Sequence, residues 1–274
     1  MQYEPIKHGL SKIFSRSVFL RKLFYRLLDL LLLRTWYIHR EFRIWSAGCK
    51  CSAGKNDNVH ILDAGAGFGQ YSYYLSNINT GWNILAVDIN KKHVTDCNTF
   101  FSKIGRTTVS FKTADLTTFQ QQNSFDLILS VDVMEHIPDD DMVFRNFYAS
   151  LKDGAMLLIS TPSDKGGAAV HKEDATSFIE EHVRNGYNIF DIRDKLKASG
   201  FLKIEAHYSY GIPGKISWYL SMKYPILMLG TSKLFYILLP FYYLIAYPIA
   251  FALNHLDISI KLNRGMGLIV KAWK

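Results

Sequence analysis

The sequence predicts an α/β protein built around a doubly wound parallel sheet. Short apolar segments alternate with helix-forming segments between residues 59 and 211, which is the pattern of repeated strand–helix–strand units. A glycine-rich loop follows the first apolar segment, and acidic residues end several of the others. In a sheet of this kind the ligand binds at the carboxyl ends of the strands. These loops therefore mark the expected site.

Each element can be placed along the chain. The first strand is expected at residues 59–63, and a helix begins near Tyr71. Further strands are expected at residues 83–88, 109–115, 125–131, 155–161 and 201–208. Helices are expected at residues 91–104 and 139–151, and another ends near residues 195–200. The strands are short, apolar and bounded by turn residues or acids.

The composition indicates one medium-sized folded domain with additions. The chain has 274 residues, of which 49% are hydrophobic and 14% aromatic, and a chain of this length buries a full core without cross-links. Its three cysteines, Cys49, Cys51 and Cys97, are too few for a disulfide framework. Cys49 and Cys51 also lack the second half of a zinc site. We therefore expect a reducing compartment.

The charge is unevenly distributed. Residues 1–45 carry a net charge of +6, residues 46–211 carry −4, and residues 212–274 carry +6. The basic residues at both ends lie among Leu, Phe, Ile and Tyr rather than among the polar residues that reach phosphates in nucleic-acid binders. This pattern favours an anionic membrane surface as a partner, and no nucleic acid is expected.

Residues 9–45 are expected to be helical, because they contain no proline and repeat apolar residues at helical spacing. One face collects basic side chains and another collects apolar ones. The basic set is Lys12, Arg16, Lys22, Arg26 and Arg34, and the apolar set is Ile13, Leu20, Phe24, Leu27, Leu28 and Leu31. The apolar face packs on the protein core in one interpretation and lies on lipid in the other.

The glycine loop differs from a dinucleotide-binding loop in its spacing. Its glycines are Gly65, Gly67 and Gly69, whereas the dinucleotide fingerprint G-x-G-x-x-G needs the third glycine one position later. Nineteen residues after Gly69, Asp88 ends the second strand. A carboxylate at that point lies beside the first loop and can accept hydrogen bonds from both ribose hydroxyls. The pattern indicates a different nucleotide pocket.

These residues resemble the class I S-adenosylmethionine (SAM)-dependent methyltransferases, in particular their small-molecule and quinone-modifying branch. The resemblance covers about residues 57–211 and a last strand at 267–274. It rests on four pieces in order: D-A-G-A-G-F-G from Asp63, the acid at 88, A-D at 114–115, and S-V-D-V-M-E-H-I-P from Ser130. It implies a seven-stranded Rossmann-like sheet with an antiparallel last strand, and SAM as the cofactor.

The resemblance also implies a set of residues around the methionine part of SAM. Asp63, Gly65 and Gly67 would surround that part, and Gly69 would complete the loop. Glycine permits the tight turn and lets the backbone approach a ligand closely. An alternative role for Asp63 is to fix the loop without touching the cofactor.

A second set is implied for the nucleoside. Asp88 would hold the ribose, Ile89 would pack on the adenine, and Asp115 would take the adenine amino group beside Ala114. Val131 would contact the cofactor through its main chain. For Asp115 the alternative is a solvated turn residue.

Candidate bases for the transfer lie near the strand ends. Glu135 and His136 follow the fourth strand, and His171 and His182 lie in a stretch that is expected to cross the mouth of the site. A histidine can take a phenolic or hydroxyl proton near neutral pH. His136 can instead orient its loop, and the other two can be surface residues. No metal is expected, because Asp132 and its neighbours lack a firm ligand spacing.

An apolar insertion separates the last two strands. In the family a short hairpin joins these strands, but here about 55 residues intervene. They include the uncharged stretch 234–253, which is broken by Pro240 and Pro248, and an earlier apolar stretch at 216–229. Strands six and seven share one sheet, so the insertion must cross a membrane an even number of times or not at all. We favour a kinked helical hairpin that dips into one leaflet and covers the site.

Other interpretations of the insertion remain open at this stage. It can be a hydrophobic subdomain buried in protein, a dimer interface in a homo-oligomer, or a true two-pass hairpin. The chain divides accordingly into basic amphipathic helices (1–45), a SAM-binding core (46–211), the insertion (212–265) and the last core strand (266–274).

The function we predict is methyl transfer from SAM to the oxygen or carbon of a lipophilic acceptor at the cytoplasmic face of a membrane. A quinone precursor, a lipid or an aryl lipid would fit. The alternatives are a soluble small molecule, a protein or an RNA as acceptor, or a non-catalytic membrane scaffold with the same fold.

Overall fold

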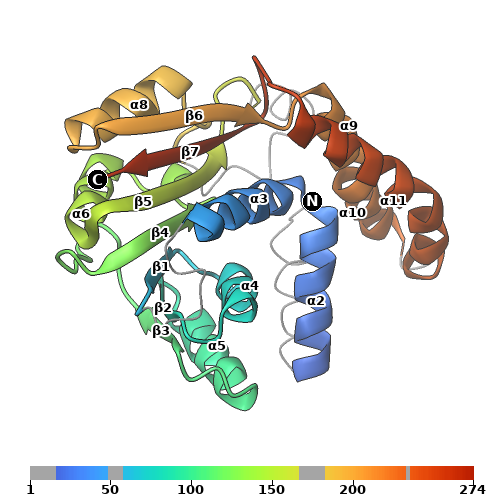
Figure 1. Cartoon of the computed structure of the whole chain (residues 1–274). Coiled ribbons are helices and arrows are strands. Elements are labelled where there is room, and N and C mark those ends of the chain that lie inside the picture. Colours follow the sequence, from blue (N-terminus) through green and yellow to red (C-terminus); the bar gives the residue numbers. More distant parts are fainter. Residues whose placement is uncertain (1–16, 49–57, 167–182, 233–234) are drawn as a thin grey trace.

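The computed structural model describes residues 17–48, 58–166, 183–232 and 235–274. At its centre is a seven-stranded sheet in the order β3-β2-β1-β4-β5-β7-β6 (Figure 1). The strands are β1 His60–Ala64, β2 Asn83–Asp88, β3 Val109–Thr113, β4 Phe125–Val131, β5 Leu151–Pro162, β6 Lys203–Ser209 and β7 Gly267–Trp273. The predicted fold class, a doubly wound Rossmann-like sheet, is confirmed.

The directions of the strands indicate where a ligand site forms. The pairs β1–β2, β2–β3, β1–β4 and β4–β5 are parallel, and only β7 runs antiparallel to its neighbours β5 and β6. The chain order reverses between β1 and β4, and a ligand crevice forms outside the carboxyl ends at such a reversal. The glycine loop, Asp88 and the β4 end all lie on that edge.

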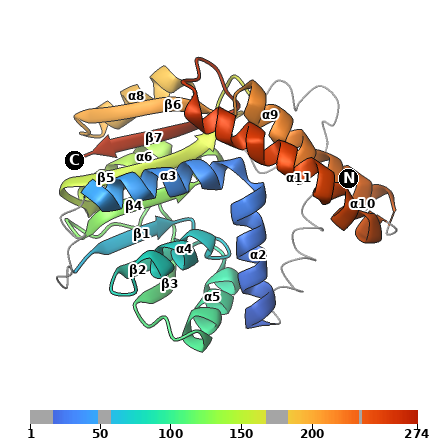
Figure 2. The same ribbon diagram turned by 45° about the vertical axis from the view of Figure 1, so that its right-hand side comes forward.

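Among the described residues before β1, the segment that was expected to be helical over residues 9–45 is divided into two helices. Helix α2 spans Val18–Leu31 and α3 spans Leu33–Gly48, because Leu32 has extended backbone angles (φ −94°, ψ 110°). Figures 1 and 2 show α3 lying along the sheet and α2 standing across the strand ends. No proline or glycine marks this break. Contacts of each helix with a different part of the core determine it.

The buried face of α2 also differs from the expectation. Its fully buried side chains are Arg21 and Tyr25, whereas Phe19, Leu23 and Leu27 are exposed. Arg21 donates to Asp96 (2.6 Å) and to the main-chain oxygen of Phe68 (3.0 Å). The expected apolar face packs on the core only in part, because Phe24 contacts the core while Leu20 and Leu28 are half-buried. Arg21, paired with the partly exposed Asp96 next to the glycine loop, takes one of the two most buried places on the helix.

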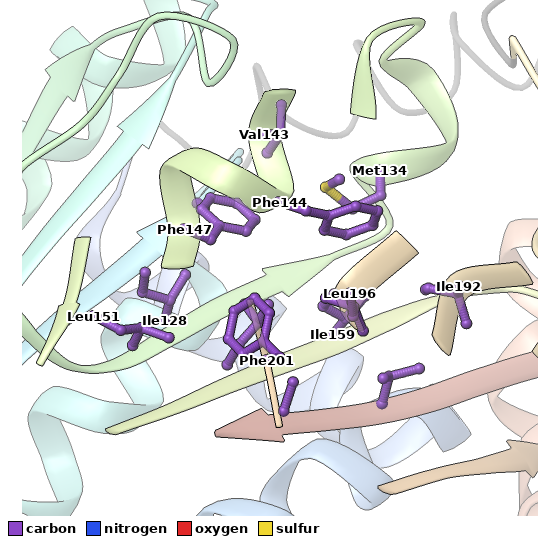
Figure 3. Packing of buried hydrophobic residues seen from close by; sticks show 14 of the residues in the cluster. Ile128, Met134, Val143, Phe144, Phe147, Leu151, Ile159, Ile192, Leu196 and Phe201 are labelled. Carbon is purple, nitrogen blue, oxygen red and sulfur yellow. The ribbon is translucent and has the colours of Figure 1, made fainter. Parts of the chain in front are cut away.

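The core has two layers, one on each face of the sheet. On one face α3, α4 (Gln70–Ile78) and α5 (Lys91–Lys103) cover alternate residues of β1, β2 and β4. On the other, α6 (Asp140–Ser150) and α8 (Ile189–Ala198) pack on β4 and β5, with Phe144, Phe147 and Phe201 at the centre (Figure 3). This alternation is what a sheet buried on both faces requires.

The insertion forms a helical hairpin between β6 and β7. One arm contains α9 (Ile212–Trp218), the single π-helical turn η3 (Tyr219–Lys223) and α10 (Tyr224–Thr231); the other is α11 (Phe235–Ser259). Pro240 and Pro248 lie inside α11 and do not break it, contrary to the expectation. The arm that packs beside α11 contains the earlier apolar stretch, residues 216–229. Figure 2 shows both arms extending away from the sheet.

A single buried carboxylate joins the root of this hairpin to the core. Asp257 of α11 accepts hydrogen bonds from the Tyr37 hydroxyl (2.7 Å), the Gly214 amide (2.9 Å) and the Tyr210 amide (3.2 Å). The side chain of Asp257 is buried. The main-chain oxygen of the same residue also lies within hydrogen-bond distance of the Tyr37 hydroxyl. Helices α3, α9 and α11 and the residue directly after β6 thus meet at one side chain.

We expect Asp257→Ala to loosen the insertion. The change leaves the amides of Tyr210 and Gly214 buried without an acceptor, which costs about 2 to 4 kcal/mol. Hydrogen exchange should accelerate at residues 210–214 while amides of β1 and β4 keep their protection. Asp257→Asn, which keeps one acceptor oxygen, should have a smaller effect. Unchanged exchange at 210–214 in the alanine variant would show that Asp257 does not hold the hairpin.

Candidate active site

The glycine loop connects β1 to α4 and carries the backbone angles that only glycine adopts easily. Gly65, Gly67 and Gly69 have φ values of 80°, 52° and 76°. The amides of Gly65 and Ala66 both donate to the Val87 oxygen at the end of β2, at 2.8 and 3.0 Å. The loop is therefore held against β2, and its shape is fixed by the main chain.

The three glycines face different surroundings. A Cβ on Gly65 would come within 2.3 Å of the Val133 side chain, and one on Gly69 within 2.9 Å of Phe111. A Cβ on Gly67 would meet no atom within 4 Å. The first and third glycines thus permit close packing within the protein, whereas the space above Gly67 is open to a ligand.

Asp88 organises the loop from the neighbouring strand. Its Oδ2 accepts from the Gly67 amide (2.8 Å) and its Oδ1 from the Asn90 amide (2.7 Å). A carboxylate can accept about four hydrogen bonds, so two sites remain for ribose hydroxyls. The next residue, Ile89, is 74% exposed. An apolar side chain at that place offers a surface for a flat ring.

Asp63 is buried beneath the loop. It is 2% exposed and accepts a hydrogen bond from the Ser72 hydroxyl of α4 (2.6 Å). Burial raises its pKa to about 6, although the bond from Ser72 opposes the shift. These contacts give Asp63 the loop-fixing role that was considered as an alternative. The contact of Asp63 with SAM stays a prediction.

The end of β3 supplies the other predicted nucleoside contacts. The Ala114 amide donates to the Asp88 oxygen (3.2 Å), which brings the two strand ends together. Asp115 is exposed, and its Oδ1 accepts from the Thr117 amide and hydroxyl at 2.9 and 2.8 Å. Asp115 therefore forms a turn of its own and stands on the same edge as Ile89.

Beyond β4 the chain turns sharply towards the glycine loop. Val131 ends the strand, and Asp132 has a left-handed backbone (φ 51°) with its amide bonded to the Ser160 oxygen (2.8 Å). Asp132 forms an ion pair with Arg34 from the start of α3. Arg34 was expected on the basic face of the amino-terminal helix. The helix break at Leu32 brings it to the strand ends instead, and no linear pattern in the sequence indicates this.

Glu135 and His136 lie in the short helix η2 (Met134–His136). Glu135 is 1% exposed and accepts from the Thr161 hydroxyl (3.1 Å), and burial raises its pKa. His136 is half-buried. The structure brings these two candidates to the strand ends. His171 and His182 lie outside the described residues.

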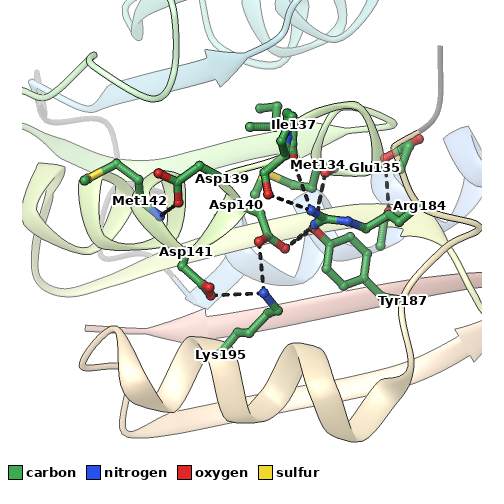
Figure 4. A network of polar contacts seen from close by, with 12 residues as sticks. Met134, Glu135, Ile137, Asp139, Asp140, Asp141, Met142, Arg184, Tyr187 and Lys195 are labelled. Atoms are coloured by element: carbon green, nitrogen blue, oxygen red, sulfur yellow. Dashed lines mark hydrogen bonds and ion pairs between the residues drawn. The ribbon is translucent and has the colours of Figure 1, made fainter.

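A polar network fixes the position of η2 (Figure 4). Asp140 is buried and accepts from Lys195 (2.9 Å) and Tyr187 (2.6 Å), and it also pairs with Arg184. Burial alone would raise the pKa of Asp140, but these bonds and charges outweigh it and hold the pKa low. Tyr187 and Arg184 also donate to main-chain oxygens of residues 134–138. These contacts hold the loop after β4 in one position beside the strand ends.

Two further observations limit the chemistry. Across the described ranges, no group of three or more His, Cys, Asp or Glu side chains is arranged to hold a metal ion. The glycine loop, the carboxylates of Asp88 and Asp115 and the exposed Ile89 fit an adenosyl group. This fit rests on the open space over Gly67 and on acceptors at two adjacent strand ends.

Comparison with known proteins places the chain in a family. A family model described as a methyltransferase domain matches residues 55–198. The chain belongs to the methyltransferase domain family. This match confirms the predicted enzyme class, a SAM-dependent methyltransferase, and with it the predicted cofactor. The helices before residue 55 and the hairpin after β6 lie outside the matched region.

The relatives match about half of the chain or less. Phosphoethanolamine N-methyltransferase 1 of Triticum aestivum is 31% identical over 151 residues, which are 53% of this chain and 29% of that protein. Ubiquinone biosynthesis O-methyltransferase of Pelagibacter ubique is 26% identical over 104 residues, 38% of this chain and 42% of that protein. The chain therefore matches less than half of the length of either relative.

A solved structure agrees in fold. Phosphoethanolamine N-methyltransferase 2 of Haemonchus contortus, in complex with SAM, superposes with a TM-score of 0.58 at 19% identity. The superposition covers 85% of this chain and 52% of that chain. The likeness extends beyond the region that the family model matches.

We expect Gly67→Ala to fold but to bind SAM at least tenfold more weakly. An alanine at this positive φ costs about 1 to 2 kcal/mol, and its methyl group fills the space proposed for the cofactor. Gly105→Ala is the matched control, because Gly105 also has a positive φ (69°) and open surroundings but lies at the opposite edge of the sheet. Calorimetric titration measures both. Equal affinity of the two variants for SAM would show that SAM does not bind at the glycine loop.

Proposed function

We propose that this methyltransferase transfers the methyl group of SAM to a lipophilic acceptor that it reaches from the cytoplasmic leaflet of a membrane. The hairpin formed by residues 212–259, called here the apolar hairpin, would dock on that leaflet. The observation that carries the proposal is the inverted polarity of this hairpin.

Large apolar side chains of the hairpin point outward. On α11, Phe241, Leu244 and Ile245 are 67%, 76% and 72% exposed. The helix has a mean hydropathy of 1.7 in its most apolar window, and only 11% of that window is buried. A soluble helix normally turns such residues inward, so a surface of this size and kind indicates an apolar environment outside the protein.

Small and polar side chains fill the interior of the hairpin. Gly214, Ser217 and Ser221 of the first arm and Ala246 and Ala250 of α11 are all buried. Gly214 lies against Leu33 and Asp257, and the Ser221 hydroxyl donates to the Leu31 oxygen. The Ser217 hydroxyl donates to the Ala250 oxygen (3.1 Å). Close approach through small residues with hydrogen bonds between helices is the way helices pack in membranes. This argues for lipid contact rather than for burial of the hairpin in protein.

Topology favours a hairpin that lies in one leaflet. Within the described part of the chain, α11 is the one helix long and apolar enough to cross a membrane, with a length of about 37 Å. A single crossing would place β6 and β7 on opposite sides, although they are paired along their whole length. The first arm carries Lys215 and Lys223, which suit an interface better than a bilayer centre.

Basic and aromatic groups border this apolar surface. The ammonium groups of Lys215 and Lys223 lie 5.9 and 4.9 Å from the centre of the Tyr219 ring. On α2, Lys22 and Arg26 are exposed beside Phe19 and Leu23. Aromatic and basic residues prefer the headgroup level of a membrane, and each basic residue near anionic lipid contributes about 1 kcal/mol.

The residues at the strand ends would divide the work of methyl transfer. Gly67 and Asp88 would hold the cofactor, Ile89 and Asp115 would place its adenine, and the rigid loop after β4 would fix the geometry. When bound, SAM supplies an activated methyl group on sulfur. His136 or Glu135 would take the acceptor proton.

The printed names of the relatives suggest two acceptor chemistries. The Pelagibacter ubique relative is named for ubiquinone biosynthesis and favours a quinone precursor as acceptor. The Triticum aestivum relative is named for phosphoethanolamine. That name supports a second candidate, an ethanolamine-type amine, either water-soluble or carried on a lipid.

We expect the triple change Phe241→Ser, Leu244→Ser and Ile245→Ser to abolish binding to vesicles that contain anionic lipid. Loss of three exposed apolar contacts should weaken binding at least about a hundredfold, while the melting temperature stays within a few degrees because these side chains are exposed. Co-sedimentation with liposomes measures this.

The matched control changes two equally exposed apolar residues elsewhere. Phe190 and Leu202 are 65% and 93% exposed near α8, and the double change to serine should leave vesicle binding intact. If the wild type does not sediment with vesicles, or forms a dimer that the triple variant loses, the hairpin is a protein interface.

We expect methyl label from SAM to enter the organic phase when the protein is incubated with a total extract of its source cells. The isosteric Asp88→Asn variant should lose this label, because an amide keeps only one acceptor oxygen for the ribose. Mass spectrometry of the labelled species identifies the acceptor. Label confined to the aqueous phase would instead support the soluble ethanolamine-type acceptor.

A further inference from the structure

Arg34 links two parts of the molecule that the family match does not join. It lies in α3, before the matched residues 55–198, yet it pairs with Asp132 at the end of β4. The side chains of Arg34 and Asp132 are 34% and 33% exposed. The pair therefore stands at the edge of the strand-end crevice rather than deep in the core.

The backbone of Asp132 is in the left-handed region. Its φ of 51° is uncommon for a residue with a side chain, and such a conformation persists only where neighbouring contacts hold it. Two contacts do so here: the amide of Asp132 donates to the Ser160 oxygen (2.8 Å), and its carboxylate pairs with Arg34.

The residue after Asp132 touches the glycine loop. The side chain of Val133 occupies the place where a Cβ on Gly65 would lie, with Cγ2 2.3 Å from that position. Any change in the backbone of Asp132 therefore moves Val133 relative to Gly65. The conformation of Asp132 thus affects the wall of the proposed cofactor pocket through one packed contact.

Arg34 is itself held from the hairpin side. Its main-chain amide donates to the Tyr210 hydroxyl (2.9 Å), and the amide of Tyr210 donates to Asp257 (3.2 Å). Tyr210 is another of the described non-glycine residues with positive φ (55°). A continuous chain of contacts thus runs from the root of the apolar hairpin through Tyr210 and Arg34 to Asp132.

We propose that Arg34 is a positioning residue for the cofactor pocket: it holds Asp132 in the left-handed conformation and so sets Val133 against the glycine loop. Arg34 acts on SAM through Asp132 and does not bind the cofactor itself. This inference rests on the proposed placement of SAM at the glycine loop and is independent of the acceptor and of membrane docking.

The test measures SAM affinity by calorimetric titration of the full-length chain. Arg34→Ala should weaken SAM binding about tenfold, because the left-handed conformation loses one of its two holding contacts. Arg34→Lys, which keeps the charge, should recover most of the affinity. The control is Arg43→Ala, which removes an exposed basic side chain from the same helix α3 and should leave SAM binding as in the wild type.

A rescue experiment separates positioning from direct binding. Glycine adopts a positive φ without support, so the double variant Arg34→Ala with Asp132→Gly should bind SAM more tightly than Arg34→Ala alone. Absence of rescue would show that Arg34 contacts the cofactor directly. A lowered melting temperature with unchanged SAM affinity in Arg34→Ala would reduce Arg34 to a structural role. Both results overturn the inference.

Gly67→Ala serves as the reference for the underlying assignment. If Gly67→Ala weakens SAM binding and Arg34→Ala does not, the cofactor placement stands and this inference fails. If neither change alters SAM affinity, the cofactor placement itself is wrong, and the inference falls with it.

Discussion

The buried carboxylate of Asp257 is the interaction on which the arrangement of this protein depends. It is the single acidic residue of the segment 212–274, and it accepts hydrogen bonds from α3, from Tyr210 directly after β6 and from α9 at once. A buried charge is tolerated only when it is fully hydrogen-bonded. These segments must therefore meet in one geometry, and this fixes the apolar hairpin relative to the strand ends.

From this anchor the hairpin extends with its polarity reversed. Residues near Asp257 face the core, whereas Phe241 and Leu244 further along α11 are exposed. The same helix is thus part of a soluble core at one end and presents an apolar surface at the other. Helix α2 ends beside this region, where the Ser221 hydroxyl donates to the Leu31 oxygen. The first turns of α2, with the exposed Phe19 and Leu23, lie near α5 and the glycine loop.

The cofactor residues could be chosen from the sequence because their roles depend on local backbone. A glycine loop after a strand and an acid at the next strand end are consequences of chain order, and the structure brings Gly67 and Asp88 within 2.8 Å of each other. The role of Asp63 could not be assigned in this way. Whether it faces a ligand or Ser72 depends on how α4 packs on β1.

The sequence by itself determined the succession of strands and helices and the glycine loop, because periodicity and turn residues act over short distances. The antiparallel last strand and the place of the insertion before it were implied by the resemblance to the methyltransferase family. Only the tertiary structure decided that the amino-terminal helix breaks at Leu32, that Arg21 rather than a leucine is buried, and that Arg34 reaches Asp132. These features depend on contacts between residues more than forty positions apart, which no local pattern records.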